Sequence, residues 1–265
     1  MVTRRHLPVF AALLALCACT GNELPAIGAS SPAETAAPAA TASLLPTEAT
    51  PDKPGFDPFS ERPATDVGKR EVIANPPIEE VMKTGPLPEM ALGRADAPVT
   101  IIQYASMTCP YCRKFDAETF PILKREYIDT GKVRYILREF PIGHQSGLAT
   151  IALRCAPPAK YFTLYSKLMA QQASWVSQEV RPDPIFKVAA QVGMTRQQFD
   201  TCRQNRGMID GLKWVKDRGR TLGIIGTPNF FIQGKLVKSV IGIKEIREMV
   251  DPHLRVAAAP DAKAR

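Results

Sequence analysis

The feature that constrains this chain most is a pair of cysteines three positions apart, placed between a predicted strand and a predicted helix. The apolar run Val99–Ile102 predicts a buried strand, and Cys109-Pro110-Tyr111-Cys112 follows it at the start of a helical pattern. The first turn of a helix presents unpaired backbone N–H groups and the positive end of the helix dipole, and both stabilise a thiolate. Pro110 suits the first helical position, where no N–H donor is needed. Cys109 is therefore the predicted nucleophile, and Cys112, one turn deeper, is the predicted resolving thiol.

The spacing of the two cysteines also fits half of a zinc site or a structural pair, so the redox interpretation needs a second signal. Such a signal lies near the C-terminus, where Ile225–Ile232 predicts a strand, Gln233-Gly234 a tight turn and Lys235–Val237 a second strand. Pro228 lies at the mouth of the first of these strands, a position that tolerates proline. A cis peptide bond before it would be a constrained feature with a purpose.

Taken together, these residues resemble the DsbA-like thiol:disulfide oxidoreductases of the thioredoxin superfamily, over roughly Ala91–Asp251. Two motifs in the same order carry the resemblance: strand, Cys-Pro-Tyr-Cys and helix first, then Gly-Thr-Pro before an aromatic strand. The resemblance implies an α/β thioredoxin fold with an inserted helical subdomain at about 142–222. It also implies a cis Pro228 that faces the cysteine pair, with the backbone of Thr227 pairing with an extended substrate segment.

Hydrophobic patterns predict the strands and the helix around the cysteine pair. Val133–Phe140 is expected to be a second central strand, parallel to the first because a helix connects the two. That helix is expected to break near Thr119 and to restart at Pro121. Pro86–Gly93 is expected to form an edge strand.

Only helical signals occur between residues 141 and 223, which predicts an inserted group of helices. Cys155 and Cys202 lie on the apolar faces of two of them, and in an oxidising compartment we expect a structural disulfide between them. The alternatives are a bridge that also tunes or exchanges with the active site, and two buried free thiols. The last helix, Lys244–Val250, is expected to end at Pro252.

The N-terminal region predicts export and a tether to a membrane. Residues 1–19 contain two arginines, a short apolar run and small residues before Cys19, and this pattern resembles a bacterial lipoprotein signal with Cys19 lipidated. The alternative is an ordinary cleaved signal or an uncleaved anchor. The expected location is the bacterial periplasm. The expected organisation is a signal at 1–19, a Pro/Ala/Thr-rich linker at 20–70, an extension with a short helix at 71–90, the DsbA-like domain at 91–252 and a loose tail at 253–265.

The net charge of the chain is +8, and it remains positive without Arg4 and Arg5 of the signal. The positive residues are spread singly, so we expect contact with anionic lipid or acidic clients and no nucleic-acid binding. His6, His144 and His253 lack the spacing of metal ligands, so no metal site is expected. No cofactor is expected either.

Four residues are expected to tune the redox chemistry: Pro110, Tyr111, Gln103 and Glu139. Gln103 stands where the resembling proteins usually carry a buried carboxylate thought to move the proton of the resolving thiol. Either water replaces that group, or Glu139 does so from the neighbouring strand; the alternative for Glu139 is a solvated or salt-bridged role. Tyr111 replaces a common histidine, so the predicted reduction potential lies between the thioredoxin and DsbA values of about −270 and −120 mV.

The resemblance implies a thiol:disulfide interchange protein that forms disulfides in exported proteins with free thiols. A membrane oxidase resembling the quinone-linked partner of the family would reoxidise it. Met107, Tyr111 and Phe230 are expected to line a shallow client groove, and a monomer is expected. The alternatives are a reductase or isomerase on the same fold, or a module whose thiols hold a soft metal. No dimerisation module is expected before Ala91, which disfavours the isomerase.

Overall fold

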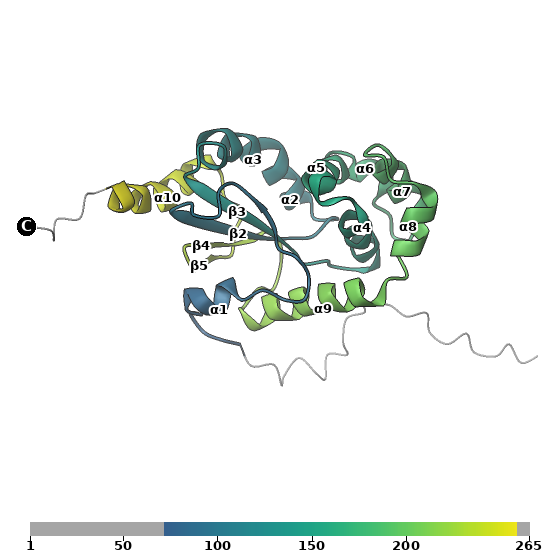
Figure 1. Cartoon of the computed structure of the whole chain (residues 1–265), viewed down its shortest axis with the longest axis horizontal. Helices are drawn as coiled ribbons and strands as arrows, with labels where there is room; N and C mark the ends of the chain where they lie inside the picture. Colours follow the sequence, from purple (N-terminus) through teal and green to yellow (C-terminus); the bar gives the residue numbers. More distant parts are fainter. Residues whose placement is uncertain (1–71, 259–265) are drawn as a thin grey trace, which may run out of the picture. The chain divides into compact units, whose positions relative to one another are not determined.

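The computed structural model describes residues 72–258. Within this range the chain folds around a five-stranded mixed sheet with the strand order β1-β3-β2-β4-β5 (Figure 1). The predicted signal with Cys19 and the predicted linker lie outside the described residues. The strands are β1 (Met90–Leu92), β2 (Val99–Ala105), β3 (Val133–Glu139), β4 (Asn229–Ile232) and β5 (Lys235–Val237).

The pairing of β2 explains how distant parts of the sequence meet. β2 runs parallel to β3, as the helical connection between them predicts, and antiparallel to β4. Tyr104, near the end of β2, lies opposite Asn229, the first residue of β4. The loop after β2, with the cysteines, and the loop before β4, with Pro228, therefore emerge at the same edge of the sheet.

Helices cover both faces of the sheet and form a separate group beside it. In Figure 1, α4 to α8 lie to one side of the strands, while α1 and α9 lie below the sheet and α3 and α10 above it. The helical segments are α1 (Ile78–Met82), α2 (Pro110–Lys114), η2 (Phe115–Thr119), α3 (Phe120–Leu123), η3 (Lys124–Ile128), α4 (His144–Cys155), η4 (Pro158–Lys160), α5 (Tyr161–Ala170), α6 (Gln172–Trp175), α7 (Pro182–Ala190), α8 (Arg196–Cys202), α9 (Arg206–Thr221) and α10 (Ile243–Ala258).

The alternation of side chains along β2 divides the core between the two faces of the sheet. Ile101 and Ala105 belong to the larger core, which also includes residues of α2, α5, α7 and α10. Ile102 and Tyr104 belong to a smaller core on the other face, with Val81 of α1 and the segment after α9. Both faces of β2 are covered, which accounts for its nearly continuous apolar sequence.

The helix after the cysteine pair does not break at Thr119 as predicted. The chain stays helical from α2 through η3, and two segments, η2 and η3, widen into π turns. At the first of them, the N–H of Phe120 bonds to the carbonyl of Phe115, five residues back. A wider turn relieves the clash that a proline ring makes with the preceding turn, so Pro121 is accommodated inside α3.

The last helix also runs further than predicted. α10 contains Pro252 and continues to Ala258, so residues 253–258 are helical rather than loose. Leu254, beyond the proline, packs against the larger core and holds this turn in place. Pro252 supplies no N–H to the carbonyl of Glu248, and Glu248 is an exposed residue.

The strand predicted at Ile225–Ile232 begins only at Asn229. Pro228 has no N–H for the sheet, and Ile225 is 84% exposed, so the first half of the segment is a loop. The predicted edge strand is likewise shorter, and only Met90–Leu92 pairs with β3.

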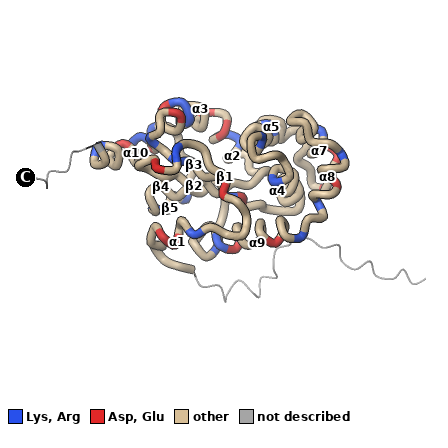
Figure 2. Tube along the Cα trace, viewed as in Figure 1, with Lys and Arg blue, Asp and Glu red and all other residues tan. Residues whose placement is uncertain are grey.

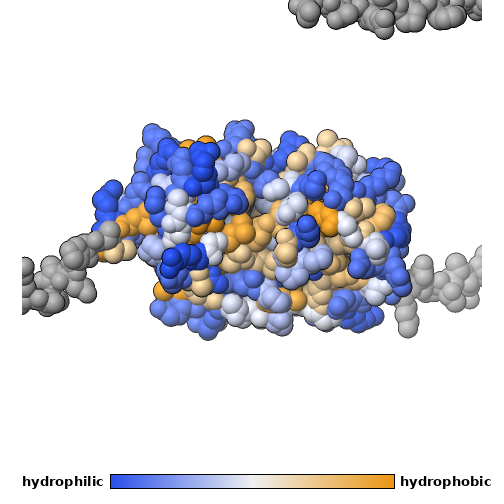
Figure 3. All heavy atoms as spheres, turned by 45° about the horizontal axis from the view of Figure 1, so that its top comes forward, coloured by the Kyte–Doolittle hydropathy of each residue, from blue (hydrophilic) through white to orange (hydrophobic). Residues whose placement is uncertain are grey.

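Lys and Arg residues are interspersed with Asp and Glu residues along the described chain, as Figure 2 shows near α3, α7, α8 and α9. On the face shown in Figure 3, apolar residues form a band across the middle, bordered by hydrophilic residues. Within residues 72–258, no helix has the length and apolar content needed to cross a bilayer.

Candidate active site

Cys109 is the N-cap residue of α2, immediately after the loop that follows β2. Pro110 occupies the first turn, where its missing N–H has no cost. The Cys109 sulfur accepts a hydrogen bond from the backbone N–H of Cys112, with 3.4 Å between nitrogen and sulfur. Among the described cysteines, these two are the free thiols, so the pair is in its reduced form.

Pro228 faces this pair from the other loop, and the peptide bond between Thr227 and Pro228 is cis. The Cys109 thiol donates a hydrogen bond to the carbonyl oxygen of Thr227 at 3.1 Å. The Asn229 side chain donates to the carbonyl of Pro228 at 2.7 Å, which ties the start of β4 to this loop. The structure thus brings Cys109, Thr227 and Pro228 together, although more than a hundred residues separate the cysteine from the proline.

The surroundings of Cys109 favour its thiolate. Its pKa falls from 9.0 to about 6, mainly because the Cys112 thiol can donate a hydrogen bond to it. The backbone N–H groups of Cys112 and Tyr111 act in the same direction, and partial burial opposes them. At pH 7 most Cys109 side chains are therefore ionised and reactive.

Cys112 differs from Cys109 in that its side chain is fully buried. Burial is the main cause that raises the pKa of its thiol well above the usual value, and the adjacent Cys109 adds to the effect. The pair is therefore asymmetric, with one accessible acidic thiol and one buried thiol that keeps its proton.

The inserted helices hold the cysteine loop through polar side chains that the sequence analysis did not single out. The Ser106 hydroxyl lies 2.7 Å from the Ser146 hydroxyl of α4, and both serines are buried. The Gln172 amide donates to the carbonyls of Met107 at 2.8 Å and Cys109 at 3.1 Å. In the sequence, the only sign of these contacts is a polar residue on an otherwise apolar helix face. This sign does not show which residue the polar side chain contacts.

Gln103 and Glu139 both lie in the core but have different partners. Gln103 is fully buried, and its side-chain oxygen accepts a hydrogen bond from the Tyr135 hydroxyl. Glu139 forms a bidentate ion pair with Arg154 and accepts a hydrogen bond from the Tyr161 hydroxyl at 2.5 Å. A carboxylate held this way favours the salt-bridged alternative for Glu139 over a role in proton transfer.

The prediction that Met107 and Phe230 line a client groove is wrong, because both side chains are fully buried in the larger core. Tyr111 is 58% exposed. Ile142 and Ile225 are also exposed apolar residues; Ile142 accepts a hydrogen bond from Thr108 through its carbonyl, and Ile225 lies two residues before Thr227.

Cys155 of α4 and Cys202 of α8 are joined by a disulfide, with 5.9 Å between their Cα atoms. The bond links two helices of the insertion. Within residues 72–258, no group of three or more His, Cys, Asp and Glu side chains is arranged to hold a metal ion.

A family model described as thioredoxin matches residues 87–252, more than half of the chain. The chain belongs to the thioredoxin family.

The names of similar proteins refer to disulfide chemistry. A protein of Rickettsia conorii named as a protein-disulfide oxidoreductase is 30% identical over 167 residues, covering 60% of this chain and 59% of that protein. Disulfide bond formation protein D of Bacillus subtilis is 25% identical over 171 residues, covering 62% of this chain and 76% of that protein. The chain therefore spans less than two thirds of the length of the Rickettsia relative.

The crystal structure of alpha-DsbA1 from Wolbachia pipientis superimposes with a TM-score of 0.61 at 28% identity, covering 67% of this chain and 96% of that one. The comparisons confirm the thioredoxin fold and the resemblance to DsbA-like proteins. The helical insertion is consistent with this fold. The matched domain is a thiol:disulfide oxidoreductase of this type.

Proposed function

We propose that the whole protein is a thiol:disulfide interchange protein that forms disulfides in exported proteins through Cys109 and Cys112. One observation carries the proposal: an accessible, acidic Cys109 sulfur faces the Thr227 carbonyl beside a cis Pro228, with a buried Cys112 behind it. Such a pair favours the reduced state of the enzyme, because the Cys109 thiolate is stabilised, and so favours oxidation of a client.

In the proposed reaction the oxidised pair meets a client thiolate, which attacks the Cys109 sulfur. The bond between the two enzyme sulfurs breaks, and Cys112 leaves as a thiolate that takes up a proton. A second client thiolate then attacks the client sulfur of the mixed disulfide, and Cys109 leaves as a thiolate. The client loses two electrons and gains a disulfide, while the enzyme pair is reduced.

The backbone of Thr227 is the proposed docking point for an extended client segment. When Cys109 is protonated, the Thr227 carbonyl accepts a hydrogen bond from its thiol. When Cys109 is ionised or joined to a client it has no thiol hydrogen, so the carbonyl is available to a client N–H. Exposed Tyr111, Ile142 and Ile225 supply apolar contact for clients of varied sequence.

The proposed location is the periplasm, with Cys19 as the lipid-modified anchor and a membrane oxidase as the partner that restores the disulfide. The signal-like residues 1–19 support this proposal. The Cys155–Cys202 disulfide also supports it, because structural disulfides persist in oxidising compartments. We propose that the protein acts as a monomer.

The deciding experiment traps the thiols of Cys109 and Cys112 in intact cells by acid quenching and alkylation. A mostly oxidised pair supports donation of disulfides, and a mostly reduced pair would overturn it in favour of reduction or isomerisation. Cys112→Ser tests the enzyme against a metal carrier. The variant should accumulate mixed disulfides with exported proteins, whereas a carrier of soft metal would form none.

A further inference from the structure

Gln172, the first residue of α6, has a polar side chain buried against the cysteine loop, residues 106–112. It is 4% exposed, and its amide nitrogen donates to the carbonyl oxygens of Met107 at 2.8 Å and Cys109 at 3.1 Å. Only the nitrogen of the amide can face two carbonyl oxygens, because the amide oxygen has no hydrogen to donate. The two acceptors therefore determine the orientation of the Gln172 side chain.

The carbonyl of Cys109 is the one polar backbone group of the peptide that joins Cys109 to Pro110. The nitrogen of this peptide belongs to the proline and carries no hydrogen. The carbonyl accepts the backbone N–H of Arg113 at 3.1 Å, from its own helix, and the amide of Gln172, from the insertion. The direction in which the Cys109 residue points its side chain thus depends in part on a contact from outside the active-site helix.

The cysteine loop is bound from a second direction by α4. The Ser146 hydroxyl accepts the backbone N–H of Met107 at 3.1 Å and lies 2.7 Å from the Ser106 hydroxyl. The Ser106 hydroxyl also accepts the backbone N–H of Ile142 at 3.2 Å. Met107 is therefore held at its N–H by α4 and at its carbonyl by α6.

The support of Gln172 is itself well held. Gln145, next to Ser146 on α4, donates to the carbonyl of Trp175 in α6 at 2.7 Å. Trp175 is fully buried, and its indole N–H donates to the carbonyl of Leu168 in α5 at 2.8 Å. The contacts form a closed circuit, because α4 binds the loop, the loop binds α6, and α6 binds α4. A positioning group must be fixed by its surroundings, and Gln172 meets this condition.

We propose that Gln172 is a positioning residue of the redox pair, whose amide holds the Cys109 peptide so that the Cys109 sulfur stays aligned for attack by Cys112. The step that needs this alignment begins with Cys109 joined to a partner by a mixed disulfide. Cys112 gives its thiol proton to a buffer base, its sulfur bonds to the Cys109 sulfur, and the partner leaves as a thiolate. The rate depends on the geometry of the reacting atoms, and a misplacement of about 1 Å can cost about 100-fold.

The proposal rests on thiol exchange at Cys109 and Cys112 and holds for either direction of electron flow. It is tested by mixing the reduced full-length protein with glutathione disulfide. Mass spectrometry follows the mixed disulfide on Cys109 as it forms in the first step and disappears in the second, Cys112-dependent step. If thiol exchange at Cys109 were absent, the parent protein would form no mixed disulfide, whereas failure of the present proposal would show only in the Gln172 variants.

Gln172→Met keeps the length of the side chain and removes both hydrogen bonds to the loop. The second step should slow about 10-fold, while the first step should change by less than about 2-fold, because it does not require alignment with Cys112. Gln172→Glu keeps the shape but turns an oxygen toward the two carbonyls, and it should slow the second step as well. Gln172→Asn keeps an amide donor on a shorter side chain and should recover part of the rate.

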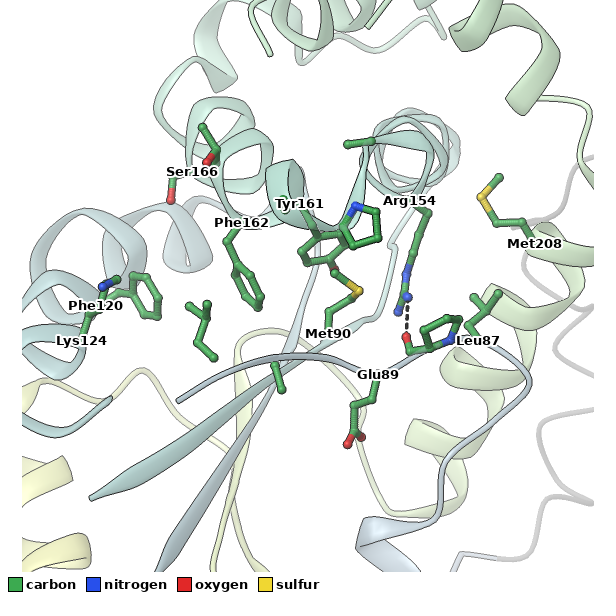
Figure 4. Close-up of a pocket in the computed structure, with 17 residues that line it drawn as sticks. Leu87, Glu89, Met90, Phe120, Lys124, Arg154, Tyr161, Phe162, Ser166 and Met208 are labelled. Carbon is green, nitrogen blue, oxygen red and sulfur yellow. Dashed lines mark hydrogen bonds between the residues drawn. The ribbon is translucent and has the colours of Figure 1, made fainter. Parts of the chain in front are cut away.

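Two controls separate positioning from packing. Gln171→Met makes the same substitution one residue earlier, where the amide bonds to exposed Gln191 at 3.0 Å, and it should change neither step. Phe162→Leu alters the packing of α5 at a pocket of about 810 Å³, which Phe120 and Tyr161 also line (Figure 4). The described residues that line this pocket include none from the cysteine loop. Phe162→Leu should therefore lower the free energy of unfolding by urea and leave both steps unchanged.

The expected result is a slower second step in Gln172→Met and Gln172→Glu, with a partial recovery in Gln172→Asn. The proposal is overturned if Gln172→Met and Gln172→Glu keep the parent rate of the second step. It is also overturned if Phe162→Leu slows this step by the same factor, or if both steps slow equally in the Gln172 variants, because a general loss of packing would then account for the effect.

Discussion

The reactivity of Cys109 should depend on one hydrogen bond from its partner, and Cys112→Ala removes that bond alone. The Cys112 thiol is the largest contributor to the lowered pKa of Cys109, and the Cys112 and Tyr111 backbone N–H groups remain in the variant. A hydrogen bond to a charged group contributes about 1.5–3 kcal/mol, which corresponds to about 1–2 pKa units. Since Cys109 is partly exposed, solvent screening favours the lower end, about one unit.

The expected pKa of Cys109 in the variant is therefore about 7, compared with about 6 in the parent protein. At pH 7 the thiolate fraction should fall from about 0.9 to about 0.5. The assay is the second-order rate of alkylation by iodoacetamide between pH 4 and 9, with the modified cysteine located by mass spectrometry. Reactivity should rise with pH and reach half of its plateau at the pKa.

Cys112→Ser is the matched variant, because its hydroxyl keeps a donor and should leave the midpoint close to that of the parent. A midpoint still at about 6 in Cys112→Ala would refute the argument for the thiol donor. A midpoint at the unperturbed value of 9.0 would refute the contribution of the backbone donors.

Three further predictions concern stability, each measured by urea unfolding. Glu139→Gln should cost about 3–5 kcal/mol, because it leaves the Arg154 charge buried without its ion-pair partner. Replacing Cys155 and Cys202 by serine should cost about 4 kcal/mol in the chain-entropy model, because the bond closes a loop with a separation of 47 residues, and thiol exchange should continue. Gly219→Ala should cost about 1–3 kcal/mol, because the added Cβ would lie 2.8 Å from the buried Tyr104 ring.

Each of these stability predictions has a control that tests the proposed cause of the lost stability. Glu118→Gln breaks an exposed ion pair and should change stability by less than about 1 kcal/mol, and an equal loss at both sites would contradict the burial argument. Reducing the disulfide of the parent protein with an added reductant should lower the free energy of unfolding by the same amount as the double serine substitution. Gly207→Ala should be tolerated, since its Cβ would meet no atom closer than 3.6 Å, and a similar cost there would contradict the packing argument at Gly219.

The local part of the site could be predicted from the sequence because it depends on short-range rules. A cysteine followed by proline after an apolar run predicts an N-cap thiol at a strand-to-helix turn, and the structure has Cys109 there. The resemblance to DsbA-like proteins implies a cis bond before Pro228, and the structure has a cis bond at this position. The N-cap thiol needs only neighbouring residues and the periods of strands and helices.

The sequence could not determine which apolar side chains near the cysteine pair are buried in the core and which are exposed. Met107 and Phe230 look like a client surface, but the inserted helices and the sheet bury both of them. Pro252 ends a helix by local rules, yet the packing of Leu254 carries α10 beyond it.

Asp116 illustrates the difference between what the local sequence determines and what tertiary packing determines. In the sequence it is an ordinary acidic residue on a helix, and the sequence alone placed Cys109 and Cys112 at the start of that helix, ahead of it. Only the tertiary structure decided that Ser166 of α5 donates a hydrogen bond to the Asp116 carboxylate and that burial raises the pKa of this carboxyl, because both depend on packing against segments distant in the sequence. Local sequence selects the reactive groups, while long-range packing sets the burial and the hydrogen bonds that shift their pKa values.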